Sequence, residues 1–198
     1  MNQKMPEKKR CGWSANSFEA YIKYHDEEWG VPVHDEKTHF EFLILEGAQA
    51  GLSWSTIIKK REGYRSAFAG FDFEMVAQYG EGMVEELLQD SSIIRNRLKI
   101  KSAITNAKNF IKVREEFGSF DTYIWSFVNG QPLVNHWKTM SEVPATTSLS
   151  DKISKDLKKR GFKFVGSTII YAHMQAIGMV NDHTVDCFRH EEVTLEQR

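Results

Sequence analysis

The fold is decided by a stretch near the C-terminal end that reads KKRGFKFVGST over residues 158–168. One helical pattern ends in its basic residues, Gly161 terminates that helix, and the next helical pattern begins at about Val165, with Ser167 and Thr168 just after its start. A helix that starts after such a tight turn presents unpaired backbone N–H groups, which bind anions such as DNA phosphates. An ordinary solvated helix corner has the same pattern, so this stretch alone does not establish DNA binding.

Helical periodicity extends outward from this turn over nearly the whole chain. Apolar residues recur at helical spacing in segments of about 35–51, 55–68, 84–88, 94–117, 120–128, 150–160 and 165–179. No segment alternates apolar and polar residues as a half-buried strand does. We therefore expect an all-α fold with short connections, followed by a charged C-terminal tail after Cys187.

Size and composition limit the class of protein. The chain has 198 residues, of which 41% are hydrophobic, and this is enough for a sizeable buried core. It has no apolar run of membrane-spanning length, and its basic residues 1–10 lack the apolar centre of a secretory signal. We therefore expect a cytoplasmic protein with no membrane association. The net charge of −1 gives no general affinity for nucleic acid, so DNA binding needs a local basic face.

The two cysteines, Cys11 and Cys187, lie near opposite ends of the chain, and each has a histidine nearby, His25 and His183. Two thiolates and two imidazoles form a complete tetrahedral set for zinc. If residues 183–187 are helical, the His-x3-Cys spacing puts both side chains on one face. A disulfide requires an oxidising compartment, whereas two unrelated buried thiols require nothing further. The spacing alone leaves these three interpretations open.

A second informative stretch reads LEGAQAGLSW over residues 45–54. Glu46 lies inside an otherwise apolar helix of small residues, where a carboxylate must be paired, hydrated or functional. The small residues allow another element to approach closely, and Trp54 follows at the end. When such residues are considered one at a time, an ordinary structural role is commoner than a functional one: the Glu lies at a helix edge and the Trp lies in the core.

Several blocks together resemble the family of 3-methyladenine DNA glycosylases I, the constitutive bacterial branch of the helix-hairpin-helix glycosylases. Besides the two stretches above, the resemblance rests on CGW at residues 11–13, YIKYHDEEWGVP at 21–32, WSFVN at 125–129 and VNDH at 180–183. It implies an all-helical fold with two lobes around a cleft and the termini joined by a zinc site. The implied domains are a basic tail of residues 1–10, one catalytic domain of residues 11–187 with its hairpin at about 150–180, and a tail of residues 188–198.

The resemblance also implies roles for individual residues. One structural zinc ion binds Cys11, His25, His183 and Cys187, a set that leaves no open position for water. Glu46 recognises the methylated base and is the candidate catalytic residue. The base pocket is formed or supported by Trp13, Tyr21, Tyr24, Trp29, Trp54 and Asn181, the last standing where many related enzymes carry an aspartate. The hairpin residues that hold the DNA backbone are Gly161, Lys163, Phe164, Val165, Gly166 and Ser167.

The activity that the resemblance implies is base-excision repair in a bacterial cytoplasm. The enzyme hydrolyses the N-glycosidic bond of 3-methyladenine in double-stranded alkylated DNA, and it releases the free base and leaves an abasic site. Aromatic faces attract the charged base, and Glu46 accepts hydrogen bonds from its exocyclic amine. Because no lysine stands at the position after the hairpin that lyases use, we expect a monofunctional glycosylase. A monomer is the usual state of an enzyme that moves along DNA.

Two other classes of function compete with this interpretation. A non-catalytic DNA-binding module keeps the hairpin and the aromatic pocket but releases no base, so an excision assay distinguishes it. A helical scaffold or small-molecule binder buries the aromatic residues in its core and pairs Glu46 with a buried cation. The surroundings of Glu46 in the structure distinguish this second class.

Overall fold

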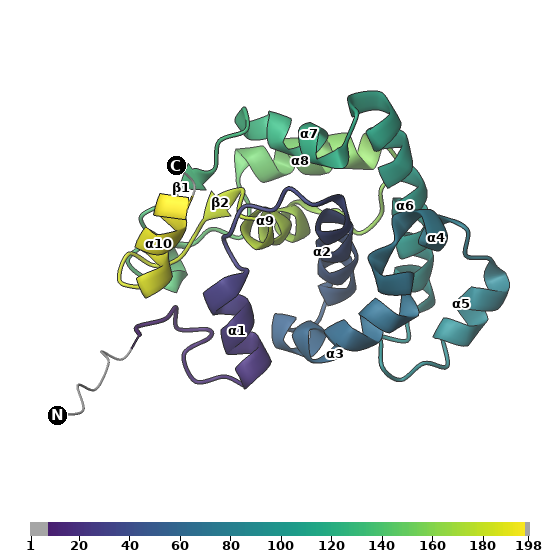
Figure 1. The fold of residues 1–198 in the computed structure, drawn as a ribbon, viewed down its shortest axis with the longest axis horizontal. Coiled ribbons are helices and arrows are strands. Elements are labelled where there is room, and N and C mark those ends of the chain that lie inside the picture. The colour runs from purple at the N-terminus through teal and green to yellow at the C-terminus, as the bar shows by residue number, and fades with distance from the viewer. Residues whose placement is uncertain (1–7, 197–198) are drawn as a thin grey trace.

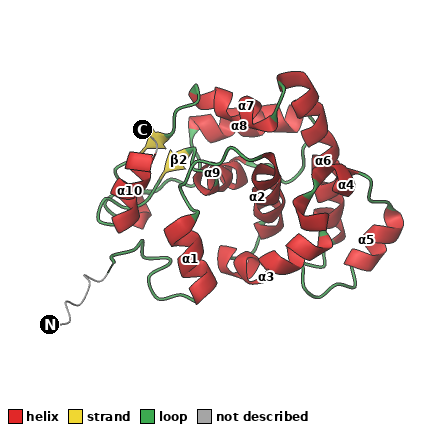
Figure 2. Cartoon of the chain, viewed as in Figure 1, coloured by secondary structure: helices red, strands yellow, loops and turns green. Residues whose placement is uncertain are grey.

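The computed structural model describes residues 8–196, shown in Figure 1 and Figure 2. The α-helices are α1 (Glu19–Glu27), α2 (Glu36–Gln49), α3 (Trp54–Ala67), α4 (Phe73–Ala77), α5 (Glu81–Leu87), α6 (Arg97–Phe117), α7 (Phe120–Trp125), α8 (Ser148–Lys159), α9 (Ser167–Ala176) and α10 (Phe188–Glu196). Short 3-10 turns are η1 (Ala69–Phe71), η2 (Ser126–Val128) and η3 (Met140–Glu142), and two short strands are β1 (Leu133–Val134) and β2 (Val180–Asn181). Most of the basic tail expected over residues 1–10 lies outside the described residues.

Helix α2 lies at the centre of the molecule and packs against α3, α6, α7 and α9 (Figure 1). Ten consecutive residues of α2, His39 to Ala48, are buried, because neighbouring elements cover all of its faces. On one side lie α3 to α6, and on the other lie α1, α10 and both strands, which bring the two ends of the chain together. The predicted all-α fold is confirmed.

Polar caps define where the main helices begin. Asp35, Ser53 and Asn96 each accept a hydrogen bond from a backbone N–H in the first turn of α2, α3 and α6. Helix α8 begins at Ser148, two residues earlier than the sequence suggested, because Thr147 and Ser150 form a reciprocal capping box. Helix α6 ends at Gly118, which adopts a φ of 86°.

The turn between α8 and α9 is held from outside by α6. Gly161 has a φ of 91°, and Phe164 has a φ of 53°, which is uncommon for a residue other than glycine. The Asn106 side chain of α6 accepts a hydrogen bond from the Lys163 N–H at 2.8 Å and donates one to the Lys163 carbonyl at 3.0 Å. The backbone N–H and carbonyl of Lys163 are thereby both hydrogen-bonded, and these bonds fix the turn relative to α6.

The structure differs from the sequence-based expectations near both ends of the chain. Residues 188–196, expected to be a tail, form α10, which packs on β2 and buries Val193 completely. The strands β1 and β2, which were not expected, pair in parallel over two residues each. The short helices α1 and α4 also had no clear periodic signal. Among the helices of residues 8–196, none combines the length and the apolar composition needed to cross a bilayer.

Candidate active site and metal centre

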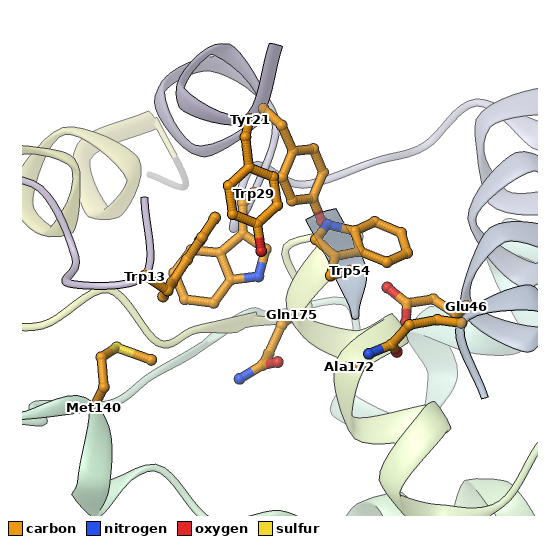
Figure 3. Close-up of a pocket in the computed structure, with 10 residues that line it drawn as sticks. Trp13, Tyr21, Trp29, Glu46, Trp54, Met140, Ala172 and Gln175 are labelled. Atoms are coloured by element: carbon orange, nitrogen blue, oxygen red, sulfur yellow. The ribbon is translucent and has the colours of Figure 1, made fainter. Parts of the chain in front are cut away.

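A cavity of about 210 Å³ opens between α1, α2, α9 and the start of α3 (Figure 3). Six of the residues that the sequence assigned to a base pocket line it together: Trp13, Tyr21, Tyr24, Trp29, Glu46 and Trp54. Four further lining residues were not expected: Gln49, Met140, Ala172 and Gln175. Gln49 lies three residues after Glu46 in the stretch of residues 45–54. The positions of Met140, Ala172 and Gln175 depend on how α9 and the connection before α8 pack, and no local motif marks these three residues.

The aromatic residues form a connected wall. The Trp13 ring packs edge-on against Tyr21 and Trp29, with ring centroids 5.0 Å and 5.1 Å apart. The Tyr24 ring lies 5.5 Å from Trp54 on the opposite part of the wall. Tyr24 and Trp29 are buried, whereas Trp13, Tyr21 and Trp54 are only partly covered and present surface to the cavity. Such a wall has the electron-rich faces that attract a planar cation.

Glu46 reaches from α2 into the cavity below Trp54 (Figure 3). Its side chain is 3% exposed, and its Oε2 has no hydrogen-bond partner among the described residues. Burial raises the pKa of Glu46 from 4.5 to about 8, since the charged form loses its hydration. The pKa of Tyr24 is also raised well above 10, first by burial and then by the nearby charge of Glu46. A buried acid without a partner in a cavity indicates a binding site.

This environment argues against the scaffold interpretation. That interpretation requires a buried cation beside Glu46, and the part of the chain that is described provides no ion pair for it. The acid instead faces the same cavity as the aromatic wall. The indole Nε1 of Trp54 is likewise buried without a partner. Unsatisfied polar atoms that share one cavity are explained by a ligand that satisfies them.

Asn181, expected to contact the substrate, does not line the cavity. It is fully buried in β2, and its amide nitrogen donates to the His190 carbonyl at 3.0 Å and to Thr194 Oγ1 at 3.1 Å. Its Oδ1 accepts a hydrogen bond from the His183 N–H at 3.2 Å. Asn181 therefore ties α10 to the segment after β2, and the expected substrate contact is corrected to this structural role.

Cys11, His25, His183 and Cys187 come together, fully or almost fully buried, with their ligand atoms all within 4.8 Å of one another. Cys11 Sγ lies 3.6 Å from His183 Nδ1, and Cys187 Sγ lies 3.5 Å from both His25 Nε2 and His183 Nδ1. Bonds of the usual zinc–sulfur and zinc–nitrogen lengths at a tetrahedral angle separate the two ligand atoms by about 3.6 Å. The cluster therefore fits one tetrahedral metal ion. Both cysteines are free thiols.

The second ring nitrogen of each histidine is also engaged. His25 Nδ1 donates to Asp26 at 2.8 Å, and His183 Nε2 donates to the Trp29 carbonyl at 2.9 Å. These bonds leave the other nitrogen of each ring unprotonated and directed at the thiols, as in metal sites. Residues 183–187 form a turn rather than the helix considered from the His-x3-Cys spacing.

The cluster of two cysteines and two histidines packs directly against the aromatic wall. The Trp29 ring packs edge-on against the His183 ring at 4.6 Å, and on its other side it meets Trp13. The Trp13 ring also lies 5.1 Å from the His25 ring. The joining of the two chain ends and the shape of the cavity are therefore linked through Trp29.

The residues of the hairpin turn between α8 and α9 differ in how exposed they are. Lys158 and Lys163 are exposed beside the turn, and Gly166 begins α9 without any side-chain cap, so the first backbone N–H groups of α9 remain available. The Ser167 hydroxyl lies 2.8 Å from that of Ser150. Val165 is 2% exposed, and its carbonyl accepts a hydrogen bond from the buried Ser154 hydroxyl at 2.6 Å, so it anchors the turn in the core.

The hairpin is also close to the helix that carries Glu46. A side chain at Gly47 of α2 would place its Cβ 3.3 Å from the Cβ of Phe164. This close approach explains why a glycine follows the acid in the sequence. The hairpin turn therefore packs directly on the helix that carries Glu46.

A family model and the related proteins of known function all indicate the same family. The family model described as methyladenine glycosylase matches residues 13–190. DNA-3-methyladenine glycosylase 1 of Escherichia coli K12 is 54% identical, covering 90% of this chain and 95% of that protein. DNA-3-methyladenine glycosylase of Haemophilus influenzae is 45% identical, covering 90% and 96%.

Solved structures agree with this result. A crystal structure of a 3-methyladenine DNA glycosylase I has a TM-score of 0.87 at 49% identity, covering 91% of this chain and 98% of that one. A structure of the Staphylococcus aureus enzyme, described as showing the basis of 3-methyladenine recognition, has a TM-score of 0.87 at 35% identity, covering 90% and 95%. The sequence, the fold and the cavity agree, and the chain belongs to the methyladenine glycosylase family.

Proposed function

We propose that this protein is a base-excision repair enzyme that hydrolyses the N-glycosidic bond of 3-methyladenine in alkylated double-stranded DNA. The observation that carries the proposal is Glu46, a buried and unpartnered acid facing an aromatic cavity. The relatives named above are DNA-3-methyladenine glycosylases, and one related structure, of a Tyr-to-Phe variant, is in complex with 3-methyladenine.

Selectivity follows from the electrostatics of the cavity. A neutral adenine leaves the buried Glu46 carboxylate uncompensated, so the acid keeps its proton. A 3-methyladenine nucleotide carries positive charge on the base, which favours the ionised acid and the aromatic faces together. Ionised Glu46 then accepts hydrogen bonds from the exocyclic amine. Damage is recognised by its charge, and normal bases gain little from the same contacts.

The chemical step needs little acid catalysis, because the cationic base leaves as a neutral molecule. The base must first rotate out of the helix into the cavity. The remaining barrier comes from positive charge that develops on the sugar. Glu46 is the one carboxylate that lines the cavity within residues 8–196, so we assign it the recognition of the base and the guidance of the attacking water.

DNA is held outside the cavity by the turn between α8 and α9. The uncapped start of α9 at Gly166 and the exposed Lys158 and Lys163 are suited to the phosphates next to the flipped nucleotide. The two other basic segments, residues 59–61 and 95–101, each have a basic residue that is already engaged within the protein. Arg61 is paired with Glu28 and Glu41, and Lys99 donates to backbone carbonyls at the end of α2.

The cluster of Cys11, His25, His183 and Cys187 is assigned to one structural zinc ion. Four protein ligands leave no position for a substrate or water, so the ion supplies folding energy rather than chemistry. The packing of Trp29 on His183 and of Trp13 on His25 places the cluster behind the aromatic wall, which supports this assignment. The expected effect of the ion on catalysis is therefore indirect, through the shape of the aromatic wall.

The enzyme is proposed to be monofunctional. A lyase needs an amine nucleophile in the pocket, and none of the described residues that line the cavity is a lysine. The product is therefore an abasic site in an intact strand.

The direct test is incubation of the purified protein with methylated duplex DNA, followed by chromatographic identification of the released bases. We expect 3-methyladenine to be released and the strand to stay intact until alkali is added. The Glu46→Gln variant, which keeps the size of the side chain, is expected to lose most of this release. No release by the wild-type protein would contradict the proposed function, and strand cleavage without alkali would contradict the monofunctional assignment.

A further inference from the structure

Asp182, next to the metal cluster, is a fully buried carboxylate with an unusually complete set of donors. Its Oδ1 accepts hydrogen bonds from Asn135 Nδ2 and Trp137 Nε1, both at 2.7 Å. Its Oδ2 accepts from the Tyr171 hydroxyl at 2.6 Å and from Gln175 Nε2 at 2.8 Å. Four donors on two oxygens hold a carboxylate in one orientation and satisfy the charge that burial would otherwise destabilise.

One of these four donors, Gln175, also lines the base cavity. Because a carboxylate only accepts hydrogen bonds, Gln175 must turn its amide nitrogen toward Asp182. The amide oxygen then lies on the other side, toward the cavity. In Figure 3 the nitrogen of Gln175 points away from Glu46 and its oxygen points to the Glu46 side. This oxygen has no hydrogen-bond partner among the residues that the structure describes, so it is available to a ligand.

We propose that Gln175 is a second specificity-determining hydrogen-bond acceptor of the cavity and that Asp182 is the positioning residue that orients it. The inference rests on the proposed function, because it concerns a cationic purine in the same cavity. An amide that is free to rotate presents its NH2 group about as readily as its oxygen, and an NH2 dipole repels a cation. The hydrogen bond to Asp182 holds the NH2 group of Gln175 away from the cavity before the ligand binds, so the amide oxygen faces the ligand.

The same carboxylate also holds the opposite wall. Asn135 and Trp137 belong to the connection between β1 and α8, which brings Met140 to the rim of the cavity. Asp182 therefore links this connection to α9 at the level of the ligand. Its loss should alter the cavity on two sides, whereas loss of Gln175 should alter one contact only.

The test measures binding of two small purines by the quenching of tryptophan fluorescence. The probes are 3,9-dimethyladeninium, a permanent cation with the substituents of the damaged nucleotide, and 9-methyladenine, its neutral counterpart. The variants are Gln175→Leu, which removes the amide, and Gln175→Asn, which keeps an amide one methylene too short to reach Asp182. The matched control is Tyr171→Phe, which removes a different donor from the same Asp182 oxygen and does not line the cavity.

We expect both Gln175 variants to weaken binding of the cation by about tenfold or more and to change binding of the neutral purine little. Tyr171→Phe should lower stability but keep the preference for the cation within about twofold of wild type. In Asp182→Asn the cation affinity should fall, and adding Gln175→Leu to it should cause no further loss, since one residue acts through the other.

The outcomes separate the two proposals. A wild-type protein that does not prefer the cation contradicts the proposed function. A wild type that prefers the cation, with Gln175→Leu unchanged, overturns the role of Gln175. If Gln175→Asn binds as tightly as wild type, or if Asp182→Asn and Gln175→Leu are additive, the orientation by Asp182 is wrong. Should Asp182→Asn fail to fold, the Gln175→Asn result alone decides the question of orientation.

Discussion

At the scale of single residues, Glu46 lowers the stability of the folded protein, because its carboxylate is buried without a partner. The unfolded chain releases the proton of this acid near pH 4.5, whereas the native protein holds it to about pH 8. Between these values the native state binds more protons than the unfolded state, so stability falls as the pH rises and levels off above about 8. Because Glu46 does not stabilise the fold, we infer that its role is in binding the ligand of the cavity.

The first prediction concerns the Glu46→Gln variant. It lacks this titration, so it should match wild type in stability near pH 4 and exceed it by up to about 5 kcal/mol above pH 8. Urea denaturation at a series of pH values measures the difference. A difference that stays constant across this range would show that Glu46 is not the buried, proton-binding acid described here. Glu62→Gln, at an exposed position on α3, is the control and should show no such trend.

Residue-level reasoning on the sequence identified Glu46 and the aromatic residues because an acid among small apolar residues and clustered aromatics are unusual locally. Gln175 has no such signal, since a glutamine on a helix is common. Its orientation depends on a hydrogen bond to Asp182, which lies beyond the end of α9 and reaches Gln175 only through the fold. Asn181 was misjudged for the same reason. Its partners are His190 and Thr194 of α10, a helix that the sequence did not reveal.

At the scale of elements, the junction between α9 and β2 depends on one glycine. Gly178 has a φ of 68°, and a Cβ at this position would lie 2.2 Å from the carbonyl carbon of Val31. Its N–H donates to the Gln175 carbonyl at 3.2 Å, so the end of α9 and the cavity wall are directly connected. The backbone of residues 31–32 therefore fixes where α9 stops.

The second prediction follows from this contact. Gly178→Ala should lower the free energy of unfolding by about 3 kcal/mol or more, because the backbone cannot move away without separating two elements. Gly82→Ala in α5 is the control, because its Cβ meets nothing and a helical alanine should be neutral or stabilising by up to about 1 kcal/mol. Thermal denaturation of both variants measures this. Equal stability of the two variants would contradict the close approach at Gly178.

The elements that the sequence predicted best are the long helices with clear caps, such as α2, α3 and α6. The elements it missed are short or polar. Helix α10 buries only a few residues, chiefly Val193, so its periodicity is weak. The strands β1 and β2 are two residues long, and their pairing joins segments more than forty residues apart, which no local pattern encodes. Tertiary packing decides such elements.

At the scale of the whole molecule, the cluster of Cys11, His25, His183 and Cys187 joins the first and last parts of the chain. The cluster lies behind the aromatic wall, so stability and ligand binding should change together when it is lost. Zinc itself was a sequence-based prediction; the structure adds four buried donors at tetrahedral separations and histidines with oriented second nitrogens.

The third prediction concerns metal removal. The purified protein should contain one zinc ion per chain, and Cys187→Ser should lose it and become less stable by at least about 2 kcal/mol, or about 5 °C. Elemental analysis and thermal denaturation measure the two effects. His34→Gln, an exposed histidine outside the cluster, should keep both the ion and the stability. A metal-free protein with unchanged stability in Cys187→Ser would contradict the assignment of the cluster to zinc.

The most direct measurement of the central claim is the pKa of Glu46 in the free and the ligand-bound protein, from NMR titration of its labelled carboxyl carbon. The pKa should be near 8 in the free protein, fall below neutrality with 3,9-dimethyladeninium bound, and stay high with 9-methyladenine. A pKa near 4.5 in the free protein, or an equal response to both purines, would contradict recognition of damaged bases by charge in this cavity.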